Sequence, residues 1–164
     1  YYAISNLKKQ GHPIELHLVG SGDQSAINRM LNSISQHSKC EEYIYYYGEL
    51  SFKQTLNWYK KADIFAYSSS CENLPNILLE AMAASLPIAC SNRGPMPEIL
   101  KDAGIYFNPE QVCSITSSIK LLIENESLRK SLGKRAHLYS REYSWEQCAR
   151  DTFSFLSYVN KKYS

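Results

Sequence analysis

The sequence lacks the features that would place the protein in several large functional classes. No apolar run approaches the roughly 20 residues that a membrane-spanning helix needs, and the N-terminus has no signal-peptide pattern. Charge of one sign is also scarce, because 18 Lys and Arg residues face 16 Asp and Glu residues and leave a net charge of +2. So small an excess argues against a broad electrostatic grip on nucleic acid or on an anionic membrane. We therefore expect no nucleic-acid partner.

Cysteine motifs are absent as well. The five cysteines form no Cys-x-x-Cys pair, and only His37 lies close to one of them, three positions before Cys40. One such pair is weak evidence for zinc. An odd number of cysteines without a framework is typical of reduced thiols in a cytoplasmic protein, where we expect most of them to be small core residues. A hydrophobic content of 44% is enough for one packed core.

Short apolar runs alternate with longer amphipathic stretches along most of the chain. The runs have the length of strands and are rich in β-branched or aromatic residues; they occupy residues 14–19, 43–47, 64–67, 87–90 and 105–107. Apolar residues at helical spacing lie between them, at about residues 24–38, 51–61, 75–85 and 95–102. This alternation predicts an α/β fold, a Rossmann-like, doubly wound parallel sheet with helices on both faces.

The two ends of the chain are both predicted to be helical. After the last strand the helical pattern continues over residues 110–125, 128–143 and 145–158, and the pair Ser144 and Gln147 matches a capping box. Residues 1–10 also form a helical pattern, although a doubly wound unit normally begins with a strand that lies centrally in its sheet. We therefore expect one domain, residues 1–164, with a C-terminal helical tail and without its own first strand. A start without Met agrees with a fragment.

The polar loop after the third predicted strand is the most informative segment. It leads into a helix that Pro75 is well suited to begin, and ligands of open α/β sheets bind beyond the carboxyl ends of the strands. The N-terminus of such a helix is a site for phosphate. Glu72 lies in the loop, and Glu80 lies in the helix among apolar residues, where a carboxylate must be paired, protonated or occupied by a ligand. Glu80 is thus either a ligand-binding carboxylate or a structural one bonded to backbone or to arginine.

These two carboxylates belong to a longer pattern. The segment Ser-x-x-Glu-x7-Glu-Ala-Met-Ala-Ala, which begins at Ser69, resembles the signature of the group 1 retaining glycosyltransferases. Other segments resemble that family in the same order, among them residues 19–22, 47–50, 91–99 and 143–145. The resemblance extends over nearly the whole chain. It implies the C-terminal, nucleotide-sugar-binding domain of a two-domain enzyme with the GT-B fold.

The resemblance also assigns roles to individual residues. Glu80 would bind the ribose diol of the donor, and Glu72 would be the catalytic residue beside the donor sugar. The other donor-binding residues that it implies are Asn73, Leu74 and Asn76, whose backbone N–H groups would hold sugar and diphosphate, Gly20 in the glycine turn, and Tyr47, Gly48 and Glu49, where the base would lie. The family's phosphate-binding basic residues usually follow the strand that this chain lacks. Arg93 is a candidate cation, or else a solvated turn residue.

The implied reaction transfers a sugar to a glycan or lipid-linked acceptor with retention of configuration. The resemblance implies no metal and no cofactor besides the donor substrate, and the chain has no Asp-x-Asp cluster. The acceptor, and any membrane contact, would belong to the N-terminal domain of a cytoplasmic enzyme that is at most peripheral to the inner membrane face. This chain alone is expected to be inactive. Two alternatives stay open, a catalytically silent nucleotide-sugar-binding or scaffolding module and a nucleotide-sugar epimerase.

Overall fold

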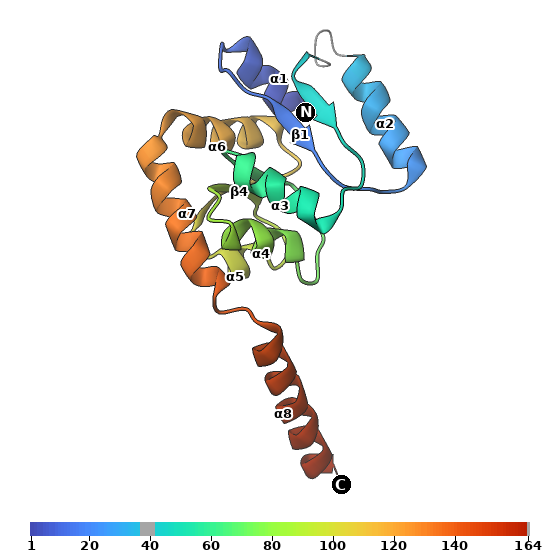
Figure 1. Ribbon diagram of the computed structural model, residues 1–164, viewed down its shortest axis with the longest axis vertical. Coiled ribbons are helices and arrows are strands. Elements are labelled where there is room, and N and C mark those ends of the chain that lie inside the picture. The colour runs from blue at the N-terminus through green and yellow to red at the C-terminus, as the bar shows by residue number, and fades with distance from the viewer. Residues whose placement is uncertain (37–41, 164) are drawn as a thin grey trace.

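The computed structural model describes residues 1–36 and 42–163, and Figure 1 shows an α/β body with one helix standing apart from it. Within these residues the strands are β1 (Leu16–Leu18), β2 (Ile44–Tyr46), β3 (Phe65–Tyr67), β4 (Ile88–Ser91) and β5 (Gly104–Phe107). The helices are α1 (Tyr2–Lys9), α2 (Gln24–Ser35), α3 (Phe52–Lys61), α4 (Asn76–Ala83), α5 (Met96–Leu100), α6 (Val112–Glu124), α7 (Glu126–Ser140) and α8 (Trp145–Tyr163). The predicted alternation of strands and helices is confirmed. His37, Cys40 and the predicted end of the second helix lie outside the described residues.

Side chains at the helix starts explain why several helices begin where they do. The carboxylate of Asp23 accepts hydrogen bonds from two backbone N–H groups in the first turn of α2, which would otherwise lack partners. Ser51 and Gln54 form a capping box at the start of α3. Ahead of α8, the N–H of Gln147 donates to the hydroxyl of Ser144 at 3.1 Å, one half of the predicted capping box.

All strand pairs are parallel, as predicted, but the pairing falls into two groups. β1 pairs with β2, and β4 lies between β3 and β5. Within residues 1–36 and 42–163, no strand pairing joins β1 to β3. The common doubly wound order places the second and fourth strands on either side of the first, and β1 and β3 match those two positions. The expectation of an additional first strand stays a prediction.

The core lies on both faces of the group β3–β4–β5. β4 is the middle strand, and all of its residues are buried. Because successive side chains of a strand point to opposite faces, Cys90 packs in a cluster with residues of α4, α5 and α7, whereas Ala89 packs in a cluster with residues of α1 and α6. At Gly133, α7 passes so close to the turn between α4 and β4 that a Cβ would clash with the carbonyl oxygen of Ser85. The predicted helices on both faces are thus confirmed.

The C-terminal helix is confirmed and runs to Tyr163. Figure 1 shows α8 extending away from the body, and none of its residues is buried. Its large apolar side chains Trp145, Phe153, Phe155 and Leu156 are each more than half exposed. No helix within the described ranges is both long and apolar enough to cross a membrane.

The cysteines differ from the sequence expectation. Cys90 is buried in β4, but Cys71, Cys113 and Cys148 are exposed free thiols, so the expectation that most cysteines are core residues is wrong for the described ones. The reason is their location, since these three lie in the loop before α4, in the first turn of α6 and in α8, where nothing covers them.

Candidate functional site

The loop between β3 and α4 carries most of the predicted site. Pro75, buried ahead of the first turn of α4, supplies no N–H. The N–H of Asn76 donates to the carbonyl oxygen of Leu74 at 3.0 Å, so this predicted phosphate-binding group is engaged in a turn and would have to release that bond first. The backbone N–H groups of Asn73 and Leu74 have no acceptor in the described part of the chain, and both residues are exposed. The loop therefore offers two free N–H groups where the sequence predicts three.

Glu80 lies in α4, and its carboxylate is held by a tyrosine. The hydroxyl of Tyr59, from α3, donates to Oε2 of Glu80 at 3.0 Å. α4 is buried on one side only, because Leu78 and Met82 are buried whereas Ile77 is 48% exposed, although the apolar residues around Glu80 suggest burial on all sides. Neither an arginine nor a backbone N–H pairs with Glu80 among the described residues, and Oε1 makes no hydrogen bond there. The structural interpretation of Glu80 therefore lacks the partners that it required.

Glu72 is held in a similar way. The hydroxyl of Tyr67, the last residue of β3, donates to Oε1 of Glu72 at 2.6 Å. This bond, together with one from the Ser69 hydroxyl, holds the pKa of the Glu72 carboxyl below its usual range, although partial desolvation acts in the opposite direction. The backbone of Glu72 lies against the turn at Gly94, where an added Cβ would stand 3.9 Å from the Glu72 nitrogen. Glu72 is thus ionised at neutral pH and fixed from two sides.

Tyr59 and Tyr67 are site residues that sequence reasoning missed. Their side chains are buried, and burial followed by the neighbouring carboxylate raises the pKa of both hydroxyls, which stay protonated donors. The ring of Phe65 lies 6.0 Å from each of the two tyrosine rings, edge-on to Tyr59 and stacked on Tyr67. A sequence signal existed for Tyr67, which ends the strand that leads into the loop. None existed for Tyr59, which lies 21 positions from Glu80.

The predicted glycines of the two preceding strands come together. The N–H of Gly20, after β1, donates to the carbonyl oxygen of Gly48, after β2, at 2.9 Å, and the Tyr46 hydroxyl donates to the carbonyl oxygen of Gly20. Gly20 has φ +140° and Gly48 has φ +68°, conformations that other residues rarely adopt. A shallow hollow beside this glycine pair is lined by Val19, Tyr46 and residues of α2. Both glycines thus follow their strands, as predicted from the sequence, but the hydrogen bond between them was not predicted.

Tyr47, predicted near the base, belongs to an aromatic group. Its hydroxyl lies 3.0 Å from Nδ1 of His17, and its ring packs against that of Trp58, from α3, with 4.7 Å between centroids. The ring of His17 also lies 4.6 Å from that of Trp58. Tyr47 is 40% exposed, so one part of its ring remains open to a planar ligand.

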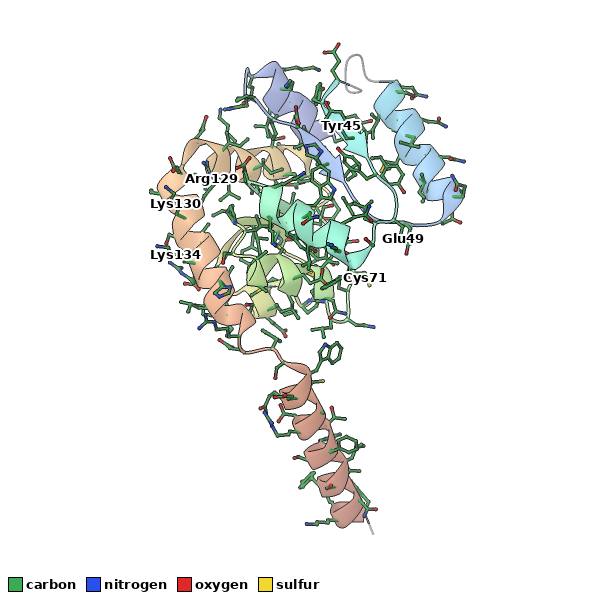
Figure 2. All side chains as sticks on the ribbon, in the orientation of Figure 1. Tyr45, Glu49, Cys71, Arg129, Lys130 and Lys134 are labelled. Carbon is green, nitrogen blue, oxygen red and sulfur yellow. The ribbon has the colours of Figure 1, made fainter. Side chains whose placement is uncertain are left out.

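Figure 2 shows where the candidate loops lie on the molecule. Glu49, which is exposed, and Cys71, next to Glu72, are on the same side of the view, in the loops after β2 and β3. Lys130 and Lys134 lie along α7 on the opposite side. In this view Glu49 and the loop at Cys71 therefore lie on the side of the body away from these lysines.

Arg93 does not offer a free cation. Its guanidinium group donates to the carboxylate of Glu110 at 2.8 Å, and both side chains are exposed. Of the two interpretations, the solvated turn residue agrees better with this pairing. In the described ranges, no group of three or more His, Cys, Asp or Glu side chains could hold a metal ion.

The fold recurs in solved structures at low sequence identity. A glycosyltransferase from Rickettsia africae matches 98% of this chain with a TM-score of 0.85 and 20% identity, and the match covers 43% of that protein. The HepE protein of Anabaena, solved in complex with UDP-glucose, matches 95% of this chain with a TM-score of 0.81 and 18% identity, over 44% of its own length. These likenesses show a common fold, the GT-B fold that the sequence resemblance implies.

Sequence relatives identify the family. The O-antigen chain mannosyltransferase B of Escherichia coli is 28% identical over 137 residues, which are 84% of this chain and 36% of that relative, so the chain spans little more than a third of it. The family described as Glycosyl transferases group 1 matches residues 1–138, which include every predicted site residue. The two carboxylates, their loop and the glycine pair thus occur in a chain that belongs to the group 1 glycosyltransferases.

Proposed function

We propose that this chain is the C-terminal, donor-binding domain of a retaining glycosyltransferase. The full-length protein would transfer the sugar of a nucleotide-diphosphate sugar to a glycan or lipid-linked glycan. The UDP-glucose complex of HepE supports a nucleotide-sugar donor, and the mannosyltransferase relative supports the transfer of a sugar. The observation that carries the proposal is the placement of Glu72 and Glu80 on one loop-and-helix unit, each oriented by a tyrosine hydroxyl, beside two free backbone N–H groups.

Glu80 is suited to bind a ribose. A carboxylate has about four acceptor positions on its two oxygens, and Tyr59 occupies one of them on Oε2. The remaining positions accept hydrogen bonds from the two neighbouring hydroxyls of a ribose. Glu80 lies in the second turn of α4. Because helix side chains tilt back toward the N-terminus, a ribose bound there would place its diphosphate toward the loop at Asn73 and Leu74.

The charges of the reaction match the groups of the loop. When the bond between the sugar and the diphosphate breaks, negative charge grows on the diphosphate, and the N-terminus of α4 and the free N–H groups of Asn73 and Leu74 stabilise it. Positive charge grows on the sugar ring, and the ionised Glu72 carboxylate stabilises that charge. In this proposal the diphosphate is bound by protein groups rather than by a metal.

Calorimetry of the full-length protein with UDP-, GDP- and ADP-sugars tests donor binding. We expect one of these to bind, and Glu80→Ala to weaken it at least about tenfold, because a hydrogen bond to a charged group contributes roughly 1.5–3 kcal/mol. Glu72→Ala should keep most of the binding but lose turnover. Glu126→Ala is the matched control, since Glu126 is an exposed carboxylate on α7 that pairs with Lys130.

Each alternative has its own outcome. If no nucleotide sugar binds, the proposal is wrong. Binding without transfer, unchanged by Glu72→Ala, indicates a silent module, and release of an epimerised sugar without acceptor indicates an epimerase. The anomeric configuration of the product, measured by NMR, tests retention, and an inverted product contradicts it.

A further inference from the structure

Two tyrosine hydroxyls at the candidate site contact the carboxylates directly. Tyr59 and Tyr67 end on Glu80 and Glu72, the two carboxylates to which that function assigns donor binding and chemistry. Some other tyrosines of the body end on backbone carbonyls, as Tyr106 does on Lys101, and Tyr139 ends on the carboxylate of Asp102, away from the site. We propose that Tyr59 and Tyr67 are positioning residues, which fix the carboxylates of Glu80 and Glu72 in the orientations that bind and activate the donor. The inference rests on the proposed function and adds two residues to it.

Burial makes these hydroxyls effective positioning groups. Tyr59 is 9% and Tyr67 6% exposed, so neither ring can move away from its carboxylate without leaving the core. A glutamate side chain without such a partner samples several rotamers, and ordering it opposes ligand binding. Glu72 and Glu80 are only partly buried, so the two hydroxyls supply the order that packing does not.

Phe65 connects the two tyrosines into one unit. Phe65 and Tyr67 stack on β3, and Tyr59 from α3 meets the same Phe65 ring edge-on, with 6.0 Å between centroids in both pairs. Both carboxylates are therefore positioned by tyrosines that pack on the same Phe65 ring, although Glu72 lies in a loop and Glu80 in a helix. Two ends of a donor, the ribose and the sugar, would then be bound at a fixed separation.

Tyr59→Phe tests the Glu80 half through the ribose. The probe is whichever of UDP, GDP and ADP binds the wild-type full-length protein, together with its 2′-deoxy form. We expect Tyr59→Phe to weaken binding of the ribonucleotide about tenfold. The affinity for the 2′-deoxynucleotide should change much less, because that ligand lacks one of the two hydroxyls from which Glu80 would accept a hydrogen bond. Equal weakening of both ligands would mean a merely structural tyrosine, and no weakening would overturn this half of the proposal.

Tyr67→Phe tests the Glu72 half through the pH profile of transfer. Loss of the hydroxyl removes a hydrogen bond that stabilises the ionised carboxylate, so the pKa of Glu72 rises. As the pH is lowered, the variant should therefore lose activity at a higher pH than the wild type does. The hydroxyls of Tyr67 and Ser69 are the groups that act on this carboxylate, and no charged side chain pairs with it within the described residues. We expect kcat to fall about tenfold with little change in donor KM.

Controls separate the outcomes. Tyr106→Phe removes a hydroxyl from a partly buried tyrosine of the same body and should keep the wild-type pH profile and KM. A direct measurement, 13C NMR titration of the Glu72 carboxyl in the wild-type protein, needs no variant, and an unshifted pKa overturns the Tyr67 half. If the wild type itself neither binds nor transfers, the proposed function fails. If the wild type transfers and both phenylalanine variants behave like it, only the present inference fails.

Discussion

At the scale of single residues, Ser85 holds a backbone conformation that its side chain opposes. It lies exposed in the turn between α4 and β4 with φ +61°, in the left-handed region that favours glycine. We expect Ser85→Gly to raise the free energy of unfolding by about 0.5–1 kcal/mol. Removal of the Cβ relieves a strain of about 1–2 kcal/mol, and the greater conformational entropy of glycine in the unfolded chain offsets part of this gain. Urea denaturation measures the change. Ser85→Ala keeps the Cβ and should give no gain; an equal gain would contradict the explanation.

The candidate site shows which residues a sequence reveals. Glu72 and Glu80 were predictable because their spacing and the helix start between them are local properties of the chain. Tyr59 was not, because its bond to Glu80 depends on how α3 packs against α4, which no local pattern encodes. Asn76 shows the same limit of local reasoning, since a position at a helix start does not tell whether its N–H already has a partner, here Leu74.

At the scale of elements, the close approach of α7 to the turn after α4 depends on one glycine. Gly133 has no Cβ, and any Cβ there would clash with the carbonyl oxygen of Ser85, a backbone atom that cannot turn aside. We expect Gly133→Ala to lower the free energy of unfolding by about 1–3 kcal/mol, as overpacking does. Gly22→Ala is the control, because no atom lies within 4 Å of its Cβ position. Comparable losses in the two variants would show that the clash is not the cause.

A second tie joins α7 to the turn before β5. The Asp102 carboxylate accepts hydrogen bonds from Tyr139 and Arg135, each at 2.7 Å, and these partners lower its pKa. A lowered folded-state pKa means that the stabilisation is present above the usual aspartate value of about 3.9 and disappears as pH falls through the folded-state pKa.

The Asp102→Asn variant tests this tie. We expect it to lower Tm at pH 7, and the difference from wild type to shrink as pH falls from 7 toward 3. A matched series of thermal melts measures it. A difference that stays constant over this range would contradict a contribution from the ionised carboxylate.

The elements themselves were largely predictable, and their pairing was not. Alternating apolar runs identified β1 to β5, with errors at the strand ends: the predicted run 14–19 contains a three-residue strand, whereas β5 begins one residue before the predicted run 105–107. Pairing depends on partners that are remote in the chain. The separation of β1 from β3 therefore had no local signature, although both strands are apolar and short.

At the scale of the whole molecule, α8 adds length to the chain but no packing to the body. None of its residues is buried, and it leaves the body after Tyr143. We expect a chain that ends at Tyr143 to keep the Tm of the 164-residue chain within about 2 °C, because a change of 1 kcal/mol would shift Tm by about 2–8 °C. Calorimetry measures it. A larger fall would mean that α8 packs on the body in solution.

The separation of β1 from β3 also divides the molecule into two parts, which we expect to differ in how readily they unfold locally. Residues of β4 are enclosed on both sides, whereas α2 buries only Ile34, and β1 and β2 bond mainly to each other. Segments with few buried contacts open without global unfolding. In native-state hydrogen exchange we expect amides of β1, α2 and β2 to exchange by local fluctuations that low urea does not accelerate, and those of β4 to follow global unfolding.

That difference has a consequence for ligand binding. The glycine pair Gly20 and Gly48 lies at the ends of β1 and β2, which we expect to open easily, whereas Glu72 and Glu80 belong to the loop and helix that follow β3. A nucleotide sugar that contacted both would therefore link the segment β1–α2–β2, which opens locally, to the more rigid part that contains β4. Binding of the nucleotide sugar would then slow amide hydrogen exchange in β1 and β2, although these strands are far from the reacting atoms.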